Sequence, residues 1–312
     1  MGRLKIFCAY HKPWPVFASD CVEPIQVGAS TSKHRLGIMR DDTGRNISSL
    51  NGGYCELTAQ YWVWQNFLPA HPEVEWVGFC HYRRFMDFWK RTGCGEASYF
   101  NFRYVPIPSF EKSFLSDYRE ENILRSIPTD AGIVLPEASL DSNVFHSLLA
   151  LYKVSWGGFG VRESLEVAND SFPDYLCDFN WALDSRRSYH CLTFLMKRDV
   201  FKKYAEWMFS FIDMVSDRIM KESWYRPDGR WEGYLAELFF NVWLLHEMRC
   251  HGTKTHECGG VMLVSPGTSV GGNKSGGLVS YLKWQGSWLK AWLWSKAILA
   301  GACLGAQKKE ST

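Results

Sequence analysis

The 312-residue sequence lacks the short motifs that define several large enzyme classes. No Gly-x-Gly-x-x-Gly follows the first predicted strand and no Gly-Lys-Ser/Thr loop occurs, so the phosphate cradles of dinucleotide oxidoreductases and P-loop kinases are missing. The single Gly-x-Ser-x-Gly string, at 267–271, does not lie between a predicted strand and a predicted helix, which weakens an assignment to the hydrolases. A dehydrogenase, a P-loop kinase and a serine hydrolase are therefore poor candidates for the function.

An excess of charge and paired cysteines are lacking as well. The 35 basic and 33 acidic residues leave a formal net charge of +2, which gives no reason to expect a nucleic-acid partner. The ten cysteines are scattered without a Cys-x-x-Cys, and the first nine residues lack the long apolar stretch of a secretory signal. We therefore expect a cytoplasmic protein.

Metal-ligand patterns are weak. An Asp-x-Asp pair, which usually holds a divalent ion against a diphosphate, is absent from the expected strand end, where His81 and Arg83 stand instead. Two cysteines and two histidines between residues 250 and 258 are too closely spaced for a usual pair of zinc knuckles. Asp41 and Asp42 are adjacent in a loop and are interpreted as turn formers. No metal site is predicted, although a divalent cofactor stays an open alternative.

What the sequence does contain is an alternation of apolar strands and amphipathic helices. Strands are expected at 4–9, 24–28, 75–80, 132–136 and 190–196, helices at 54–67, 144–154, 161–169, 199–220 and 231–248, and a long surface loop or lid at 91–110. This order predicts a layered α/β sheet, partly parallel and flanked by helices, in one catalytic domain over residues 1–270.

The most chemically functional cluster is His81-Tyr82-Arg83-Arg84, at the end of a predicted buried strand. Guanidinium groups match phosphate oxygens, and fixed cations can stabilise a leaving diphosphate. Structural salt bridges are the alternative. Tyr10 and His11 follow the first strand, at an edge where ligands collect in open α/β sheets, and are further candidates for a nucleotide site.

A carboxylate is needed if the reaction removes a proton from an attacking hydroxyl. Glu232 and Glu237 are the candidates, because they lie where a loop rich in aromatic and charged residues enters a predicted helix. Glu237 is the preferred catalytic residue. Either carboxylate could instead be a favourable charge at a helix start.

The C-terminal region differs in composition from the rest. A Gly-rich linker at 271–280 precedes a segment, 281–312, in which Trp284, Trp288 and Trp292 recur at helical spacing among lysines. Such an amphipathic helix is typical of a segment lying at a membrane surface, because the charges prevent an apolar run long enough to span it. A helix packed on the protein body is the alternative.

Several strings together resemble one family. They are PIQVG at 24–28, NIS at 46–48 with Asn51, YCELTAQYWVW at 54–64 and GFCHYRRF at 78–85. In order and spacing they are similar to the bacterial β-galactofuranosyltransferases of capsule and O-antigen polysaccharide synthesis, a family long described only as a domain of unknown function.

The resemblance implies a GT-A-like nucleotide-sugar-binding fold. It implies an inverting, UDP-sugar-dependent hexosyltransferase that transfers galactofuranose from UDP-galactofuranose to a lipid-linked glycan acceptor, at the inner face of the cell membrane. A homo-oligomer stays open. The matching positions imply a donor site near seven residues: Asn51, Tyr54, Glu56, His81, Tyr82, Arg83 and Arg84.

The second half resembles the family less closely. Leu192 and Thr193 stand where the family usually has Asn-Met, and Leu238 replaces an arginine after Glu237. A non-catalytic sugar-binding or scaffold subunit of a polysaccharide synthesis complex therefore stays as an alternative function.

Overall fold

The computed structural model of the chain describes residues 2–89, 103–140, 147–156, 158–222 and 229–266. Two compact units are present: residues 1–148 with 160–267, and residues 149–159 with 268–312. Of the second unit, the described part is mostly helix α6 (Leu148–Trp156). The predicted linker at 271–280 and the predicted helix within 281–312 lie outside the described residues.

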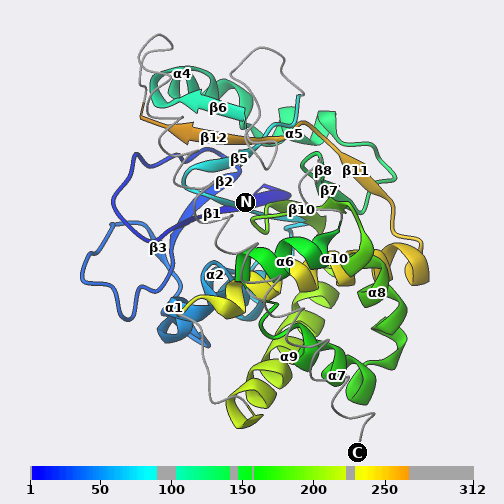
Figure 1. The fold of residues 1–312 in the computed structure, drawn as a ribbon. Coiled ribbons are helices and arrows are strands. Elements are labelled where there is room, and N and C mark those ends of the chain that lie inside the picture. The colour runs from blue at the N-terminus through cyan, green and yellow to red at the C-terminus, as the bar shows by residue number, and fades with distance from the viewer. Residues whose placement is uncertain (1, 90–102, 141–146, 157, 223–228, 267–312) are drawn as a thin grey trace, which may run out of the picture. The chain divides into compact units, whose positions relative to one another are not determined.

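The first unit is built on a mixed sheet (Figure 1). Its central strands, in spatial order, are β3 (Met39–Arg40), β2 (Val22–Gln26), β1 (Leu4–Tyr10), β4 (Trp76–His81), β10 (Phe194–Lys197), β7 (Ile133–Leu135) and β11 (Thr255–Glu257). The first four are mutually parallel, whereas β10 runs antiparallel to both of its neighbours, β4 and β7. The carboxyl ends of β1, β2 and β4 therefore meet at one edge.

Shorter strands extend this sheet. The strands β5 (Arg84–Met86), β12 (Val261–Ser265) and β6 (Arg103–Pro106) pair side by side, and β5 also pairs with β4. A separate ladder joins β8 (Ser139–Leu140) to β9 (Arg187–Ser188). The β4–β5 pairing matters most for the site, because it begins directly at His81 and Arg84.

Strand β1 is buried on both faces, as its nearly continuous apolar sequence predicts. On one face, Leu4, Ile6, Cys8 and Tyr10 join a core with side chains of α4 (Ile107–Asp117) and α5 (Glu120–Ser126). On the other face, the Phe7 ring lies 4.8 Å from Phe67 and 5.8 Å from Phe79. Side chains alternate along a strand, so this arrangement assigns every odd residue of β1 to one face and every even residue to the other.

The remaining helices gather mainly on one side of the central sheet (Figure 1), where Phe67 contacts Phe7. They are η1 (Ser48–Leu50), α1 (Asn51–Tyr54), α2 (Leu57–Trp62), η2 (Val63–Phe67), α3 (Leu68–Ala70), α7 (Val161–Ser171), η3 (Pro173–Tyr175), α8 (Leu176–Asp184), α9 (Arg198–Glu222) and α10 (Trp231–His251). Helix α9 contacts β4 and β10, and α10 packs against α8 and α9. None of the helices in the described ranges has the length and apolar composition needed to cross a membrane.

A buried ion-pair cluster fixes α10 to α8. Asp178 is fully buried and accepts hydrogen bonds from Arg249, with Nε at 2.9 Å and Nη2 at 2.7 Å, and pairs with His246 Nδ1 at 2.8 Å. Burial alone would raise the pKa of Asp178, but Arg249 and His246 hold it below its usual value. Helix α10 is thus anchored at its carboxyl end, while its first turns reach the sheet edge.

Two predicted elements differ from the structure in informative ways. The helix expected over 54–67 is interrupted at Cys55, whose φ of 51° separates α1 from α2, and it then continues through a π-helical turn to Ala70. The loop expected over 91–110 is wrong for its second part, since β6 and α4 begin there. The prolines that suggested a loop occupy the start of α4, where the missing N–H costs no intrahelical hydrogen bond. Residues 90–102 lie outside the described part of the chain.

Candidate functional site

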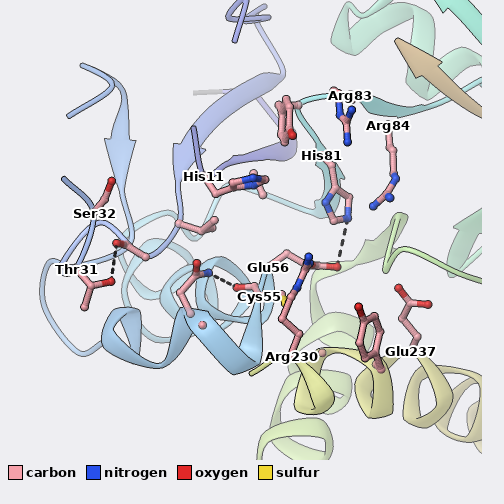
Figure 2. A pocket seen from close by; sticks show the side chains of 18 residues that line it. His11, Thr31, Ser32, Cys55, Glu56, His81, Arg83, Arg84, Arg230 and Glu237 are labelled. Atoms are coloured by element: carbon pink, nitrogen blue, oxygen red, sulfur yellow. Dashed lines mark hydrogen bonds and ion pairs between the residues drawn. The ribbon is translucent and has the colours of Figure 1, made fainter. Parts of the chain in front are cut away.

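A cleft of about 550 Å³ opens at the carboxyl ends of β1, β2 and β4 (Figure 2). It is lined by Ala9, His11, Val27, Gly28, Thr31, Ser32, Asn51, Gly52, Cys55, Glu56, His81, Tyr82, Arg83, Arg84, Arg230, Gly233, Tyr234 and Glu237. The chain passes from β1 to β2 on one side of β1 and places β4 on its other side. Ligands of open α/β sheets bind at such a reversal of strand order.

Seven of the residues predicted for a donor site line this cleft: His11, Asn51, Glu56, His81, Tyr82, Arg83 and Arg84. Glu237, the preferred catalytic candidate, lines it as well. They come from segments that lie far apart in the sequence and meet at the sheet edge.

Three other predicted residues do not line the cleft. Tyr10 points to the opposite face of β1, where its hydroxyl accepts a hydrogen bond from Phe17 N at 2.9 Å. Tyr54 is buried and donates to Asp213 Oδ1 at 2.9 Å. Glu232 packs its carboxylate against Gly53, and burial raises its pKa. Tyr10 and Tyr54 are buried and Glu232 is partly buried, so the structure does not bring these three side chains together with the cleft residues.

Arg83 is held by aromatic rings. Its guanidinium carbon lies 5.3 Å from the ring centroid of Tyr82 and 5.8 Å from that of Trp14. Among the described residues no carboxylate forms an ion pair with Arg83, so the structural salt bridge considered above is not found for this residue. Cation–π contacts position the guanidinium without neutralising its charge, which leaves it available to an anion in the cleft.

Arg84 lies deeper and is electrostatically coupled to the acidic groups of the cleft. Burial disfavours its charged form, but electrostatic interactions with Cys191, Glu237 and Glu56 outweigh burial and raise the pKa of Arg84. In Figure 2 its side chain extends from the β4–β5 turn toward the end of the cleft where Glu237 lies. Arg84 is therefore a permanent cation that is electrostatically coupled to both glutamates of the cleft.

His81 is a neutral imidazole with a defined tautomer. Its Nε2 lies 2.6 Å from the Cys191 carbonyl oxygen and 3.3 Å from Glu56 Oε1. Burial lowers the pKa of His81, and Arg84 lowers it further against the opposing effect of Glu56. Because a carbonyl oxygen can only accept, Nε2 carries the hydrogen. Nδ1 is thus the acceptor nitrogen of this ring.

Arg230 is a cleft residue that the sequence interpretation missed. It lies just before α10, and its Nε donates to Cys55 Sγ at 3.2 Å. Burial raises the pKa of Cys55 to about 11, so the sulfur is a thiol at neutral pH. The candidate carboxylates Glu232 and Glu237 lie on the helix that follows Arg230. A basic residue directly before the predicted helix that begins with Trp231 and Glu232 is the sequence feature that indicates a further cation at the cleft.

Glu237 supplies the carboxylate at the α10 side of the cleft. Its Oε2 lies 3.4 Å from His190 Nδ1, and its side chain is 19% exposed. Burial would raise the pKa of Glu237, but His190, Arg84 and the Cys191 backbone together lower it. The group is therefore ionised at neutral pH, as a general base requires.

The opposite wall depends on Asp41, which is a buried anchor and not the turn former that its loop suggested. Its carboxylate accepts hydrogen bonds from Gly28 N at 2.8 Å, Ala29 N at 3.0 Å, Ser48 Oγ at 2.5 Å and Thr58 Oγ1 at 2.6 Å. Gly28 has a φ of 62°, and an added Cβ would lie 2.7 Å from Asn51 Oδ1. This wall can approach the ligand closely because Gly28 has no side chain.

The residues of the cleft do not fit a divalent metal ion. Hard cations such as Mg²⁺ prefer several oxygen ligands. The cleft offers two carboxylates, and each lies beside a cation or an imidazole. Within the described ranges, no group of three or more His, Cys, Asp or Glu residues is arranged to hold a metal. The fixed cations Arg83, Arg84 and Arg230 occupy the cleft instead.

Comparisons with known proteins agree with this architecture. The chain is similar to a solved structure, the apo form of the bifunctional glycosyltransferase WbbM, with 28% sequence identity and a TM-score of 0.74. The match covers 88% of this chain and 47% of that chain, so this chain spans about half the length of the WbbM chain. The predicted α/β fold of a helix-flanked sheet is confirmed, and it matches a glycosyltransferase fold.

Among curated proteins no significant match was found. Residues 5–248 match the family described as "Domain of unknown function (DUF4422)", which includes every residue that lines the cleft. The chain belongs to this family.

Proposed function

We propose that the chain is an inverting glycosyltransferase that transfers galactofuranose from UDP-galactofuranose to a lipid-linked glycan acceptor in cell-surface polysaccharide synthesis. The observation that carries the proposal is the pairing, in one cleft, of three arginines with an ionised glutamate. The arginines suit a diphosphate, and the glutamate suits the removal of a proton from an acceptor hydroxyl. The similarity to WbbM supports the glycosyltransferase class.

Arg83 and Arg84 are assigned to the diphosphate of the donor. As the bond between the sugar and the phosphate breaks, negative charge accumulates on the leaving group, and preorganised cations lower the free energy of that transition state. Arg83 is oriented by two rings, and Arg84 is retained in its charged form by the nearby glutamates. Neither arginine has to reorganise when the charge develops.

Glu237 is assigned to the acceptor side. The acceptor hydroxyl attacks the anomeric carbon, its proton moves to the Glu237 carboxylate, and the electron pair of the breaking bond leaves with UDP. One displacement of this kind inverts the configuration at the anomeric carbon. The furanose form of the donor rests on the sequence resemblance described above, since a pyranose donor would place the same demands on these residues.

The differences from the family pattern leave the cleft intact, which favours an enzyme over a scaffold subunit. Leu238 is fully buried and Leu192 is nearly so, and neither lines the cleft.

The Arg83→Ala variant is expected to bind UDP-galactofuranose roughly tenfold to a hundredfold more weakly, because a charge-assisted hydrogen bond contributes about 1.5–3 kcal/mol. Saturation-transfer NMR and calorimetry with UDP-galactofuranose, UDP-galactopyranose and UDP measure this. Arg125→Ala is the control, since Arg125 is exposed and pairs with Glu121 on α5. Equal affinity of the Arg83→Ala variant and the wild type would remove Arg83 from the donor site.

We also propose that the chain works at the inner face of the cell membrane, through the Trp- and Lys-rich segment 281–312. Flotation of the full chain with anionic liposomes is expected, and a variant with Trp284, Trp288 and Trp292 all changed to Ser is expected to stay unbound. Flotation of both proteins to the same extent would contradict this location.

A further inference from the structure

Glu237 is backed by a buried histidine and a buried serine. His190 Nδ1 faces Glu237 Oε2 at 3.4 Å, and His190 Nε2 lies 2.7 Å from Ser188 Oγ. Ser188 is 0% exposed and the His190 side chain 5%, and neither lines the cleft. In a serine hydrolase the serine faces the substrate and the carboxylate is buried. Here the carboxylate faces the cleft and the serine is in the interior. Ser188 therefore cannot act as a nucleophile toward a ligand in the cleft.

The hydrogen-bonding direction follows from the chemistry of the groups. An ionised carboxylate can only accept, so Nδ1 of His190 must carry the hydrogen that points at Oε2. Nε2 can then accept from the Ser188 hydroxyl or, in a charged ring, donate to it. In both protonation states Nδ1 donates to Glu237, and Ser188 keeps the ring in the orientation that makes this possible.

A separate contact holds this segment in register with α10. Asn241 lies one helical turn after Glu237, and its side chain accepts from Tyr189 N at 2.9 Å and donates to the Tyr189 carbonyl at 3.0 Å. The same amide donates to the Glu237 carbonyl at 2.8 Å. The backbone of the residue before His190 and that of Glu237 are thus fixed by one side chain.

The two residues after His190 have left-handed backbone conformations. Cys191 and Leu192 have φ values of 66° and 44°, which cost free energy in residues that carry a Cβ. This turn directs the Cys191 carbonyl to His81 while its backbone also hydrogen-bonds Glu237. Backbone strain of this kind persists where the surrounding structure fixes it. Here the strained turn contacts both His81 and Glu237.

We propose that His190, oriented by Ser188, is a positioning residue for Glu237: it binds Oε2 from behind, so that Oε1 is presented to the acceptor hydroxyl. The inference rests on the proposed function of Glu237 as the base. During transfer the acceptor proton goes to Oε1, the sugar–phosphate electron pair leaves with UDP, and the proton is later released to water. His190 keeps its Nδ1 hydrogen throughout.

The charged and titratable groups around Glu237 are Arg84 from β5, His81 from β4, Cys55 and Glu56 from the α1–α2 junction, and His190 and Cys191 from the segment before β10. The Cys191 backbone also hydrogen-bonds Glu237, whereas His190 contacts Oε2 through a side chain that does not line the cleft. Its removal should therefore change the ionisation of Glu237 without removing a group that touches the donor.

The test is carboxyl-carbon NMR of the full chain labelled in its glutamate side chains, with the Glu237 signal assigned by its loss in Glu237→Gln. In the wild type Glu237 is expected to titrate below the ordinary range of a glutamate. In His190→Leu the midpoint should rise by about one pH unit or more. His190→Asn, which keeps a donor near the Nδ1 position, should return it toward the wild-type value, and Ser188→Ala should give a smaller rise.

The acid limb of transferase activity should move with the same sign, because activity disappears as pH falls through the pKa of the base. Unchanged Glu237 titration in folded His190→Leu protein would overturn the inference. The shift in the NMR titration without any transferase activity would leave the positioning contact intact and refute the proposed function. Transferase activity with the same acid limb in the wild type and in His190→Leu would support the proposed function and overturn the positioning role of His190.

Discussion

Glu237→Gln is expected to abolish transfer while preserving donor binding. Gln has the size of Glu but cannot take a proton from the acceptor hydroxyl, and loss of a general base lowers kcat by roughly 10²- to 10⁴-fold. UDP-sugar affinity should change little, since the arginines are assigned to the diphosphate. Initial rates of UDP release in the presence of acceptor, compared with calorimetric binding of the donor, separate the two effects.

The control for this substitution is on the same helix. Glu232→Gln changes a carboxylate five residues earlier that packs against Gly53 and does not line the cleft. It should keep a near-normal kcat. A strong loss of activity in Glu232→Gln together with normal activity in Glu237→Gln would show that the wrong carboxylate has been assigned as the base.

Asp41→Ala is expected to destabilise the protein strongly. Removing the carboxylate leaves three donors in the interior without their acceptor, two from the Gly28–Ala29 backbone and one from the Ser48 hydroxyl, while the Thr58 hydroxyl keeps the Cys55 carbonyl oxygen at 3.1 Å. Each unsatisfied buried donor costs about 1–3 kcal/mol, so the free energy of unfolding should fall by at least about 3 kcal/mol. Urea denaturation followed by tryptophan fluorescence measures this loss.

The neighbouring carboxylate provides the comparison. Asp42 pairs with Arg40 and is partly exposed, so Asp42→Ala should lower the free energy of unfolding by roughly 1 kcal/mol or less. If Asp41→Ala fails to accumulate, Asp41→Asn keeps one acceptor oxygen and should still unfold at lower urea than Asp42→Ala. Equal stability of the Asp41 and Asp42 variants would mean that the buried network contributes little.

The part of the site that could be predicted from sequence is the part carried by local patterns. The apolar run before His81 predicts a buried strand, and β4 ends where the cluster from His81 to Arg84 begins. Helix α10 begins at Trp231, as its periodicity predicts, so Glu237 reaches the cleft from the second turn. The order of the elements along the chain and their predicted ends were sufficient to predict that these residues reach the cleft.

The remaining features depend on distant pairings that local patterns do not encode. Asp41 resembles a turn residue in its own loop, and its role arises from donors seven to seventeen residues away. His190 contacts Glu237 in a segment that Asn241 ties to α10 from fifty residues further along the chain. Tyr10 is a different case, since strand alternation relative to Phe7 already predicts that it faces away from Ala9 and the cleft.

The central claim is that this cleft transfers a sugar from a UDP-linked donor. The most direct measurement follows UDP-galactofuranose by time-resolved NMR with the full chain and a lipid-linked or soluble glycan acceptor, beside the Glu237→Gln variant. We expect release of UDP and a new glycoside of inverted anomeric configuration with the wild type, and bound but unconsumed donor with the variant. Folded wild-type protein that neither binds nor consumes UDP-galactofuranose or another UDP-sugar would contradict this claim.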